Sequence, residues 1–172
     1  MTTTLFTNAH IVTGEPGSTA ASTLPLQDIL VTDGVFTAFG PGLAQQYEAQ
    51  GGDLAAIEVV DLGGKLVCPP FCDTHLHLDY VFTARKPGAV NESGTLFEGI
   101  QRWSETKSDL TVDEIKQRAK IGIKKEMLHG VQLIRSHADV TDPNLTSLKA
   151  LLELKEELKD TVTLQIVSFP QE

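Results

Sequence analysis

The pattern of hydrophobic and polar positions divides the chain into two parts. In the first part, apolar residues gather in short strand-like runs at residues 5–12, 28–31 and 35–39. Asp33-Gly34 lies between the last two runs and is a strong signal for a tight hairpin turn. These runs predict a small antiparallel sheet.

The remainder of the first part is less regular. Residues 41–56 show no clear period and are interpreted as a loop that contains at most a helical turn. Residues 59–62 and 65–68 flank a pair of glycines and predict a second hairpin. Pro69-Pro70 interrupts any strand ladder, because proline donates no backbone hydrogen bond. We therefore expect a new unit to begin after these prolines.

The second part alternates between strand and helix patterns. Strand-like runs occur at residues 71–78, 131–140 and 162–169, with helical patterns between them. Such alternation predicts parallel strands joined by right-handed crossovers, as in a doubly wound sheet or a (β/α)8 barrel. The pattern alone does not choose between the two architectures.

The helices in this part carry their own signals. Thr111 and Glu114 have capping-box spacing, and Gly130 is a natural stop for the helix that they begin. Asp142-Pro143 opens a later helix. The apolar residues expected to face the core are Leu96, Phe97, Ile100 and Trp103, then Ile115, Ala119, Ile123 and Met127, then Leu145, Leu148, Leu152 and Leu158. Trp103 is interpreted as a core or interface anchor.

Composition limits the classes of partner. The 172 residues include 14 basic and 23 acidic residues, a formal charge of -9 that disfavours binding to nucleic acid or to anionic membranes. No apolar run approaches the ~20 residues of a membrane span, and the first residues lack the features of a signal peptide. We expect a cytoplasmic protein with a small-molecule partner. Cys68 and Cys72 are expected to be free thiols.

The candidate chemistry lies in residues 73–79, which read Asp-Thr-His-Leu-His-Leu-Asp. On a strand, His75 and His77 share one face with Asp73 and Asp79. Two imidazoles on one face can reach a single divalent ion, and imidazole nitrogen suits both zinc and iron. Two ligands are an incomplete site, and an exposed polar strand face would show the same pattern.

Residues 69–79 follow the antiparallel strand region and open the alternating part of the chain. In this arrangement the sequence resembles the amidohydrolase superfamily, whose first barrel strand ends in a His-x-His metal pair. Segments 92–100, 134–140 and 165–172 are similar to the cytosine deaminases of that superfamily. The resemblance implies the N-terminal portion of a (β/α)8 TIM-like barrel preceded by a small antiparallel β-sheet domain. Residues 1–68 would be the N-terminal part of the β domain, and residues 69–172 the first three strands and intervening helices of an incomplete barrel.

The resemblance also implies roles for single residues. His75 and His77 would be the first two ligands of one metal ion, Fe(II) or Zn(II), which two histidines cannot distinguish. Gln171 would bond the pyrimidine, which suits a carboxamide because it offers both a donor and an acceptor. Leu96 would lie near the ring, although packing in the core explains a leucine there equally well.

One more candidate comes from the strand pattern. His137 shares a strand face with Arg135 and Asp139, where all three side chains could line the mouth of a barrel. His137 is therefore a further candidate for substrate binding. A hydrogen-bonded structural histidine is the commoner outcome.

The implied reaction is metal-dependent hydrolytic deamination of cytosine to uracil and ammonia. We assign no catalytic residue within this segment, because the family's later metal ligands and its general acid/base would lie beyond Glu172. Residues 1–172 alone are therefore expected to have no turnover.

One alternative is an amidohydrolase that acts on another ring, such as an aminotriazine, isocytosine or creatinine. Another is a non-catalytic fragment that binds a ligand or partner. We expect a homo-oligomer or association with the remainder of the barrel, because the last strand would otherwise be an exposed edge.

Overall fold

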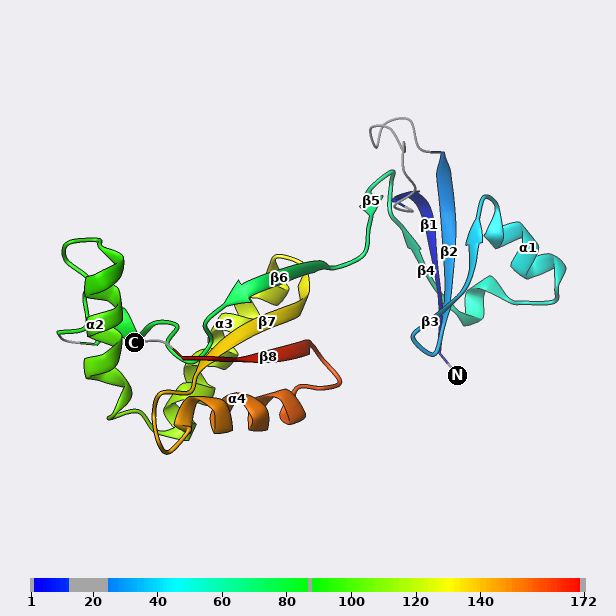
Figure 1. The fold of residues 1–172 in the computed structure, drawn as a ribbon. Coiled ribbons are helices and arrows are strands. Elements are labelled where there is room, and N and C mark those ends of the chain that lie inside the picture. Colours follow the sequence, from blue (N-terminus) through cyan, green and yellow to red (C-terminus); the bar gives the residue numbers. More distant parts are fainter. Residues whose placement is uncertain (1, 13–24, 87, 171–172) are drawn as a thin grey trace. The chain divides into compact units, whose positions relative to one another are not determined.

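The chain folds into two compact units, Met1–Pro69 and Pro70–Glu172. The computed structural model describes residues 2–12, 25–86 and 88–170, and Figure 1 shows the elements of each unit. The boundary falls between the two prolines, where the sequence pattern changes from strand-like runs to alternating strands and helices.

The first unit is built on a five-stranded sheet. Its elements are β1 (Thr3–Ile11), β2 (Leu26–Thr32), β3 (Val35–Gly40), α1 (Leu43–Ala49), the 3-10 helix η2 (Leu54–Ala56), β4 (Glu58–Asp61) and β5 (Leu66–Val67). The strand order is β3-β2-β1-β4, and β5 also pairs with β1. The antiparallel pairs are β1 with β2 and β2 with β3, whereas β4 and β5 run parallel to β1.

One of the two hairpins expected in this unit is confirmed. Asp33 and Gly34 both have positive φ angles, and the strands on either side of them pair directly, with Thr32 opposite Val35. The structure shows more helix in residues 41–56 than the sequence pattern indicated, because α1 and η2 both lie there.

The prediction of a second hairpin around Gly63-Gly64 is wrong. β4 and β5 do not pair with each other, because each pairs with a different half of β1. Asn8 separates these halves with a φ of 55°, and its carbonyl oxygen accepts the backbone N–H of Gly64 at 2.8 Å. The glycine turn therefore carries the chain forward along β1 and does not reverse it.

The second unit is a parallel sheet with crossover helices. Its elements are β6 (Phe71–Leu76), the 3-10 helix η3 (Thr83–Arg85), α2 (Leu96–Lys107), α3 (Val112–Leu128), β7 (Val131–Asp139), α4 (Thr146–Glu157) and β8 (Thr163–Phe169). The strands lie in the order β6-β7-β8, and both neighbouring pairs are parallel. Figure 1 shows α3 and α4 along the sheet and α2 beyond the ends of the strands where β6 and β8 terminate.

A hydrophobic core fills the space between this sheet and its helices. Its buried members are Leu78, Trp103, Leu110, Ile115, Ala119, Ile123, Ile134, Ala138, Ala150, Leu151, Leu154, Val162 and Leu164. The capping box at Thr111 and Glu114 is confirmed, and so is the burial of Trp103, which is 4% exposed. Burial of these apolar side chains is the main force that holds α3 and α4 against the strands.

Two of the expected buried stripes differ from the structure. Leu145 has a φ of 52° and only caps α4, so the helix begins at Thr146 and not at Asp142-Pro143. The helix turns Ser147, Ala150, Leu151 and Leu154 inward. Leu145 and Leu152 are exposed, while Leu148 and Leu158 pack against the core in part. In α2, Trp103 is buried, but Leu96 and Phe97 are 73% and 83% exposed.

Cys68 and Cys72 are both exposed free thiols. Within residues 2–12, 25–86 and 88–170, no helix has the length and apolar character that crossing a membrane requires.

Candidate active site

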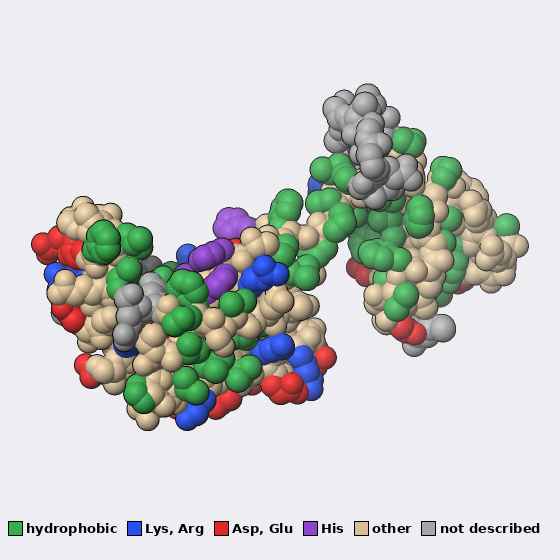
Figure 2. All heavy atoms as spheres, viewed as in Figure 1, with side chains coloured by type: hydrophobic (Ala, Val, Ile, Leu, Met, Phe, Trp, Pro, Cys, Tyr) green, Lys and Arg blue, Asp and Glu red, His purple; other side chains and the backbone are tan. Residues whose placement is uncertain are grey.

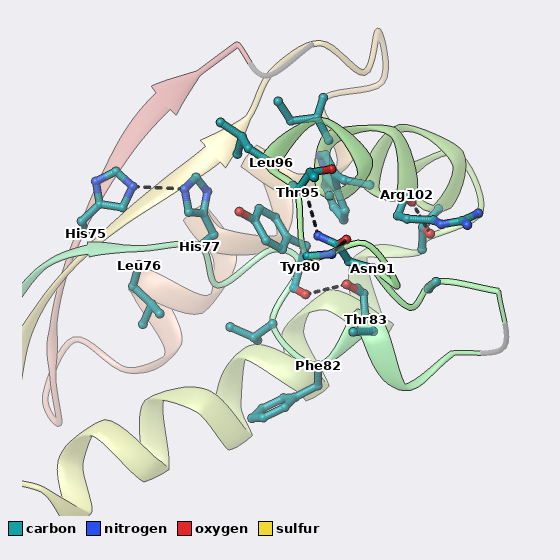
Figure 3. A pocket seen from close by; sticks show the side chains of 18 residues that line it. His75, Leu76, His77, Tyr80, Phe82, Thr83, Asn91, Thr95, Leu96 and Arg102 are labelled. Carbon is teal, nitrogen blue, oxygen red and sulfur yellow. Dashed lines mark hydrogen bonds between the residues drawn. The ribbon is translucent and has the colours of Figure 1, made fainter.

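His75 and His77 come together where β6 ends. His75 lies on the strand, the strand ends at Leu76, and His77 follows it. Their Nε2 atoms are 3.2 Å apart, and Figure 3 shows the two rings side by side. Two nitrogens bound to one tetrahedral ion at about 2.0–2.1 Å lie roughly 3.3 Å from each other. The pair therefore has the spacing of two ligands on a single ion.

The electrostatics of His77 also suit a ligand. Burial lowers its pKa below the ordinary histidine value, and the nearby His75 and His137 rings lower it further. The neutral imidazole that results at neutral pH is the form that binds a metal. No group of three or more His, Cys, Asp or Glu side chains that could hold a metal is found in the described part of the chain, so the pair remains half of a site there.

The two aspartates that flank the histidines are engaged elsewhere. Asp73 Oδ1 accepts the backbone N–H of His75 at 2.9 Å, and Asp79 lies beyond the end of β6. The pairing of β6 with β7 shifts register between Asp73 and Leu76, and the strand then ends. Beyond this point the strict alternation of side chains no longer applies, and Asp79 is fully buried. Its Oδ2 accepts the backbone N–H of Asp139 at 2.9 Å. Burial raises the pKa of Asp79 to about 6, but the carboxyl group faces the interior and is a structural anchor.

Other contacts fix the segment that carries His77. The backbone N–H of Leu78 donates to Ser136 Oγ on β7 at 3.0 Å. From α3, the Arg118 guanidinium donates to the carbonyl oxygens of Asp79 at 3.0 Å and Val81 at 3.1 Å. The chain after His77 is thus held by β7 on one side and by α3 on another, although it belongs to no strand.

His137 lies beside the histidine pair. Its ring stacks on His75 with centroids 4.2 Å apart and lies 5.5 Å from the ring of His77. The ring of Phe169, at the end of β8, packs against both rings, with its centroid 5.4 Å from that of His77 and 5.6 Å from that of His137. The structure therefore assembles three histidines where the strands end. Substrate binding by His137 remains a prediction.

A cleft of about 730 Å³ opens next to the histidines. Residues that line it include His75, His77, Tyr80, Leu96, Ile100 and Arg102, and Figure 3 shows Leu96 above Tyr80 and His77. Its volume falls within the range of roughly 300–1,000 Å³ that is typical of small-molecule pockets. Leu96 lines this cleft and is not packed in the core. Gln171 lies outside the described residues.

A hydrogen-bonded loop forms the wall of the cleft before α2. Asn91 Nδ2 donates to the carbonyl oxygen of Thr95 and Asn91 Oδ1 accepts the N–H of Gly94, both at 2.9 Å. Glu98 accepts the Ser93 hydroxyl and, at 2.7 Å, the Ser93 backbone N–H. These hydrogen bonds, with the Ser93 hydroxyl as the largest influence, lower the pKa of Glu98 to about 2.

Asp139 has a role that sequence reasoning missed. It was expected at the mouth of the barrel beside His137 but is only 2% exposed. Its Oδ2 accepts Trp103 Nε1–H at 2.5 Å and Lys107 Nζ at 3.2 Å, while its Oδ1 accepts the backbone N–H of Thr141 at 2.8 Å. One signal was available, since a buried indole N–H usually finds an acceptor.

The paired histidines stand at the carboxyl end of the first strand of a parallel strand–helix unit, which is the end at which (β/α)8 barrels carry their active sites. The chain belongs to the amidohydrolase family, whose family model matches residues 58–161. It is the N-terminal part of an amidohydrolase TIM barrel with a small β-sheet before it, and this selects the barrel from the two architectures that the hydrophobic pattern allowed.

Individual relatives include several ring-modifying enzymes. The structure of 5-methylcytosine deaminase from Klebsiella pneumoniae liganded with 5-fluorocytosine is 39% identical, with a TM-score of 0.79, and the match covers 98% of this chain and 37% of that one. N-isopropylammelide isopropyl amidohydrolase from Pseudomonas sp. (strain ADP) is 35% identical over 116 residues, 65% of this chain and 29% of that protein. Pterin deaminase from Rhizobium rhizogenes (strain K84 / ATCC BAA-868) is 27% identical over 148 residues, 83% of this chain and 31% of that protein. The chain therefore spans about a third of the length of these relatives.

Proposed function

We propose that the protein hydrolyses the exocyclic amino group of cytosine, or of a close relative such as 5-methylcytosine, at a divalent metal site to which His75 and His77 contribute. The observation that carries this proposal is the 3.2 Å approach of the two Nε2 atoms beside the cleft. The similarity to 5-methylcytosine deaminase favours a pyrimidine over other rings, because it reaches 39% identity over 98% of this chain, whereas the structure of an N-isopropylammelide isopropylaminohydrolase is 24% identical over 99%.

The chemistry that Fe(II) or Zn(II) supplies when bound is activation of water, whose pKa falls from 15.7 toward ~7. In the overall reaction, the water oxygen bonds to the ring carbon that carries the amino group, and the carbon–nitrogen bond breaks to release ammonia. The role of this chain is to hold the ion through two neutral imidazoles and to receive the ring in the cleft. Leu96 would contact the face of the planar base, and Gln171 would bond its polar edge.

The proton transfers in this reaction need a general acid/base. The two buried carboxyl groups near the cleft do not qualify, because Asp79 and Asp139 are both occupied by hydrogen bonds within the core. We infer that this group lies in the part of the barrel that this chain does not span, since the match covers 37% of 5-methylcytosine deaminase.

Ammonia release from a substrate panel tests the proposal. The protein that contains this chain would be stripped with a chelator, reloaded with Fe(II) or Zn(II), and assayed with cytosine, 5-methylcytosine, pterin and N-isopropylammelide. We expect turnover of a cytosine only after reloading. If both cytosines were inert while another ring lost its amino group, the proposed substrate class would be wrong.

A second candidate function is removal of an alkylamino group from a triazine ring. It is favoured by the 35% identity to N-isopropylammelide isopropyl amidohydrolase. Isopropylamine in place of ammonia as the product of the same panel would select it.

A further inference from the structure

A row of aromatic rings connects His77 to helix α2. The ring of Tyr80 stacks on His77 with centroids 4.8 Å apart and an interplanar angle of 29°. The same tyrosine contacts the ring of Trp103 at 4.9 Å. Figure 3 shows Tyr80 immediately beside His77 at the wall of the cleft. A single ring, that of Tyr80, therefore lies between the candidate metal ligand His77 and the buried indole of Trp103.

The far end of this row is fixed. Trp103 is 4% exposed, and its Nε1–H donates to Asp139 Oδ2. Asp139 is held in turn by Lys107 Nζ and by the backbone N–H of Thr141. Because Trp103 lies on α2 and Asp139 at the end of β7, the indole cannot move without breaking the hydrogen bond that joins the two elements.

The backbone of Tyr80 is fixed as well. Its N–H donates to Asp79 Oδ1 at 3.1 Å, and its carbonyl oxygen accepts the Thr83 hydroxyl at 2.8 Å. The Tyr80 ring is thus located from its own backbone and from Trp103. The His77 ring is surrounded by the rings of His75, Tyr80, His137 and Phe169, and among these four the Tyr80 ring has the shortest centroid distance, 4.8 Å.

We propose that Tyr80 is a positioning residue that holds the His77 imidazole in the orientation in which its Nε2 meets that of His75, with Trp103 fixing Tyr80 in turn. This inference rests on the proposed function only in that the histidine pair binds a divalent ion. Hydrogen-bonded partners that orient a metal-binding histidine affect metal affinity, and a stacked ring acts in the same way with a smaller contribution of about 2–10-fold. The structure places the Tyr80 ring in that role for His77.

Metal affinity, measured without substrate, tests the inference. The protein that contains this chain would compete with a chromophoric chelator for Zn²⁺, and the visible spectrum of its Co²⁺ form would report the ligand geometry. Tyr80→Ala is expected to weaken Zn²⁺ binding by about 2–10-fold and to alter the Co²⁺ spectrum. Tyr80→Phe keeps the ring and should restore binding close to that of the wild type.

Two further variants separate positioning from general packing. Tyr80→Leu keeps apolar bulk and therefore the fold, but it lacks the flat ring, so its Zn²⁺ affinity should fall with that of Tyr80→Ala. Tyr47, the other tyrosine of the chain, lies on α1 in the first unit, and Tyr47→Ala should bind Zn²⁺ as the wild type does. Far-UV circular dichroism of the metal-free proteins would confirm that each variant is folded.

The outcomes also separate this inference from the proposed function. Unchanged Zn²⁺ affinity in Tyr80→Ala and Tyr80→Leu, or a loss in Tyr80→Phe as large as in Tyr80→Ala, would overturn the positioning role. Weaker Zn²⁺ binding by Tyr80→Ala and Tyr80→Leu, together with no turnover of any heterocyclic substrate by the wild type, would support the positioning role and reject the deaminase. A wild-type protein that binds no Zn²⁺ or Co²⁺ would reject both.

Discussion

Replacement of Asp139 by asparagine should destabilise the second unit strongly at neutral pH. The carboxylate is 2% exposed and faces four donors, from Trp103, Lys107 and Thr141. An asparagine side chain has one acceptor oxygen, so whichever way it turns, its NH2 group meets donors. The Lys107 side chain, 13% exposed, also loses the charge opposite it. Removal of one partner from such a network costs about 2–4 kcal/mol.

The effect should depend on pH. Burial acts to raise the pKa of Asp139, but hydrogen bonds from Thr141, Trp103 and Lys107 outweigh it, so the pKa lies below the ordinary value of 3.8. A carboxyl group with a depressed folded-state pKa contributes stability that is present above its unfolded-state pKa and is lost as the pH falls through the folded value. The difference between wild type and Asp139→Asn should therefore be full at pH 7 and shrink below about pH 4.

Urea unfolding followed by far-UV circular dichroism at several pH values measures this difference. Thr141→Val is a suitable comparison, because it removes one hydroxyl donor, leaves the charge in place and should cost only about 0.5–1.5 kcal/mol. Equal unfolding midpoints for wild type and Asp139→Asn at pH 7 would refute the reasoning. So would a difference that stays constant down to the lowest pH at which the protein is folded.

Three other changes have definite expected results. Leu154→Ala removes a fully buried side chain between α4 and the sheet and should lower the free energy of unfolding by about 2–5 kcal/mol, as measured in urea. His77→Ala should abolish stoichiometric metal in elemental analysis of the purified protein, and retention of metal would reject His77 as a ligand. Glu98→Gln replaces the acceptor of the Ser93 hydroxyl and backbone N–H. It should raise KM for the substrate more than it lowers kcat in steady-state kinetics, because the loop shapes the cleft and does not touch the histidines.

Local sequence signals predicted the parts of the fold that depend on near neighbours. The capping box at Thr111 and Glu114 and the turn at Asp33-Gly34 are both complete within four residues, and both are found in the structure. The approach of His75 and His77 was also expected from strand spacing, and the two rings do meet, although the strand ends at Leu76 and His77 follows it.

The features that the sequence could not predict depend on distant residues. The strand that pairs with β4 is β1, which lies more than fifty residues earlier in the chain. The local signal of Gly63-Gly64 therefore predicted a hairpin that does not form. Asp79 and Asp139 look like exposed members of alternating strands, but their burial follows from a contact between residues sixty positions apart. In α4, Leu145 has a positive φ and the helix begins at Thr146, beyond the expected start at Asp142-Pro143, and its buried side is formed by other residues than the expected leucines.

The loop before α2 and the first turn of that helix, residues 91–98, satisfy much of their polar backbone through their own Asn91, Thr95 and Glu98 side chains. The large side chain that it presents to the cleft, Leu96, takes part in none of these hydrogen bonds. Evolution can therefore exchange Leu96 at little cost to folding, while the strands that carry the histidines stay unchanged. Under the proposed function, selectivity for the ring and binding of the metal would therefore be separable traits, which suits a scaffold that diversifies toward new heterocycles.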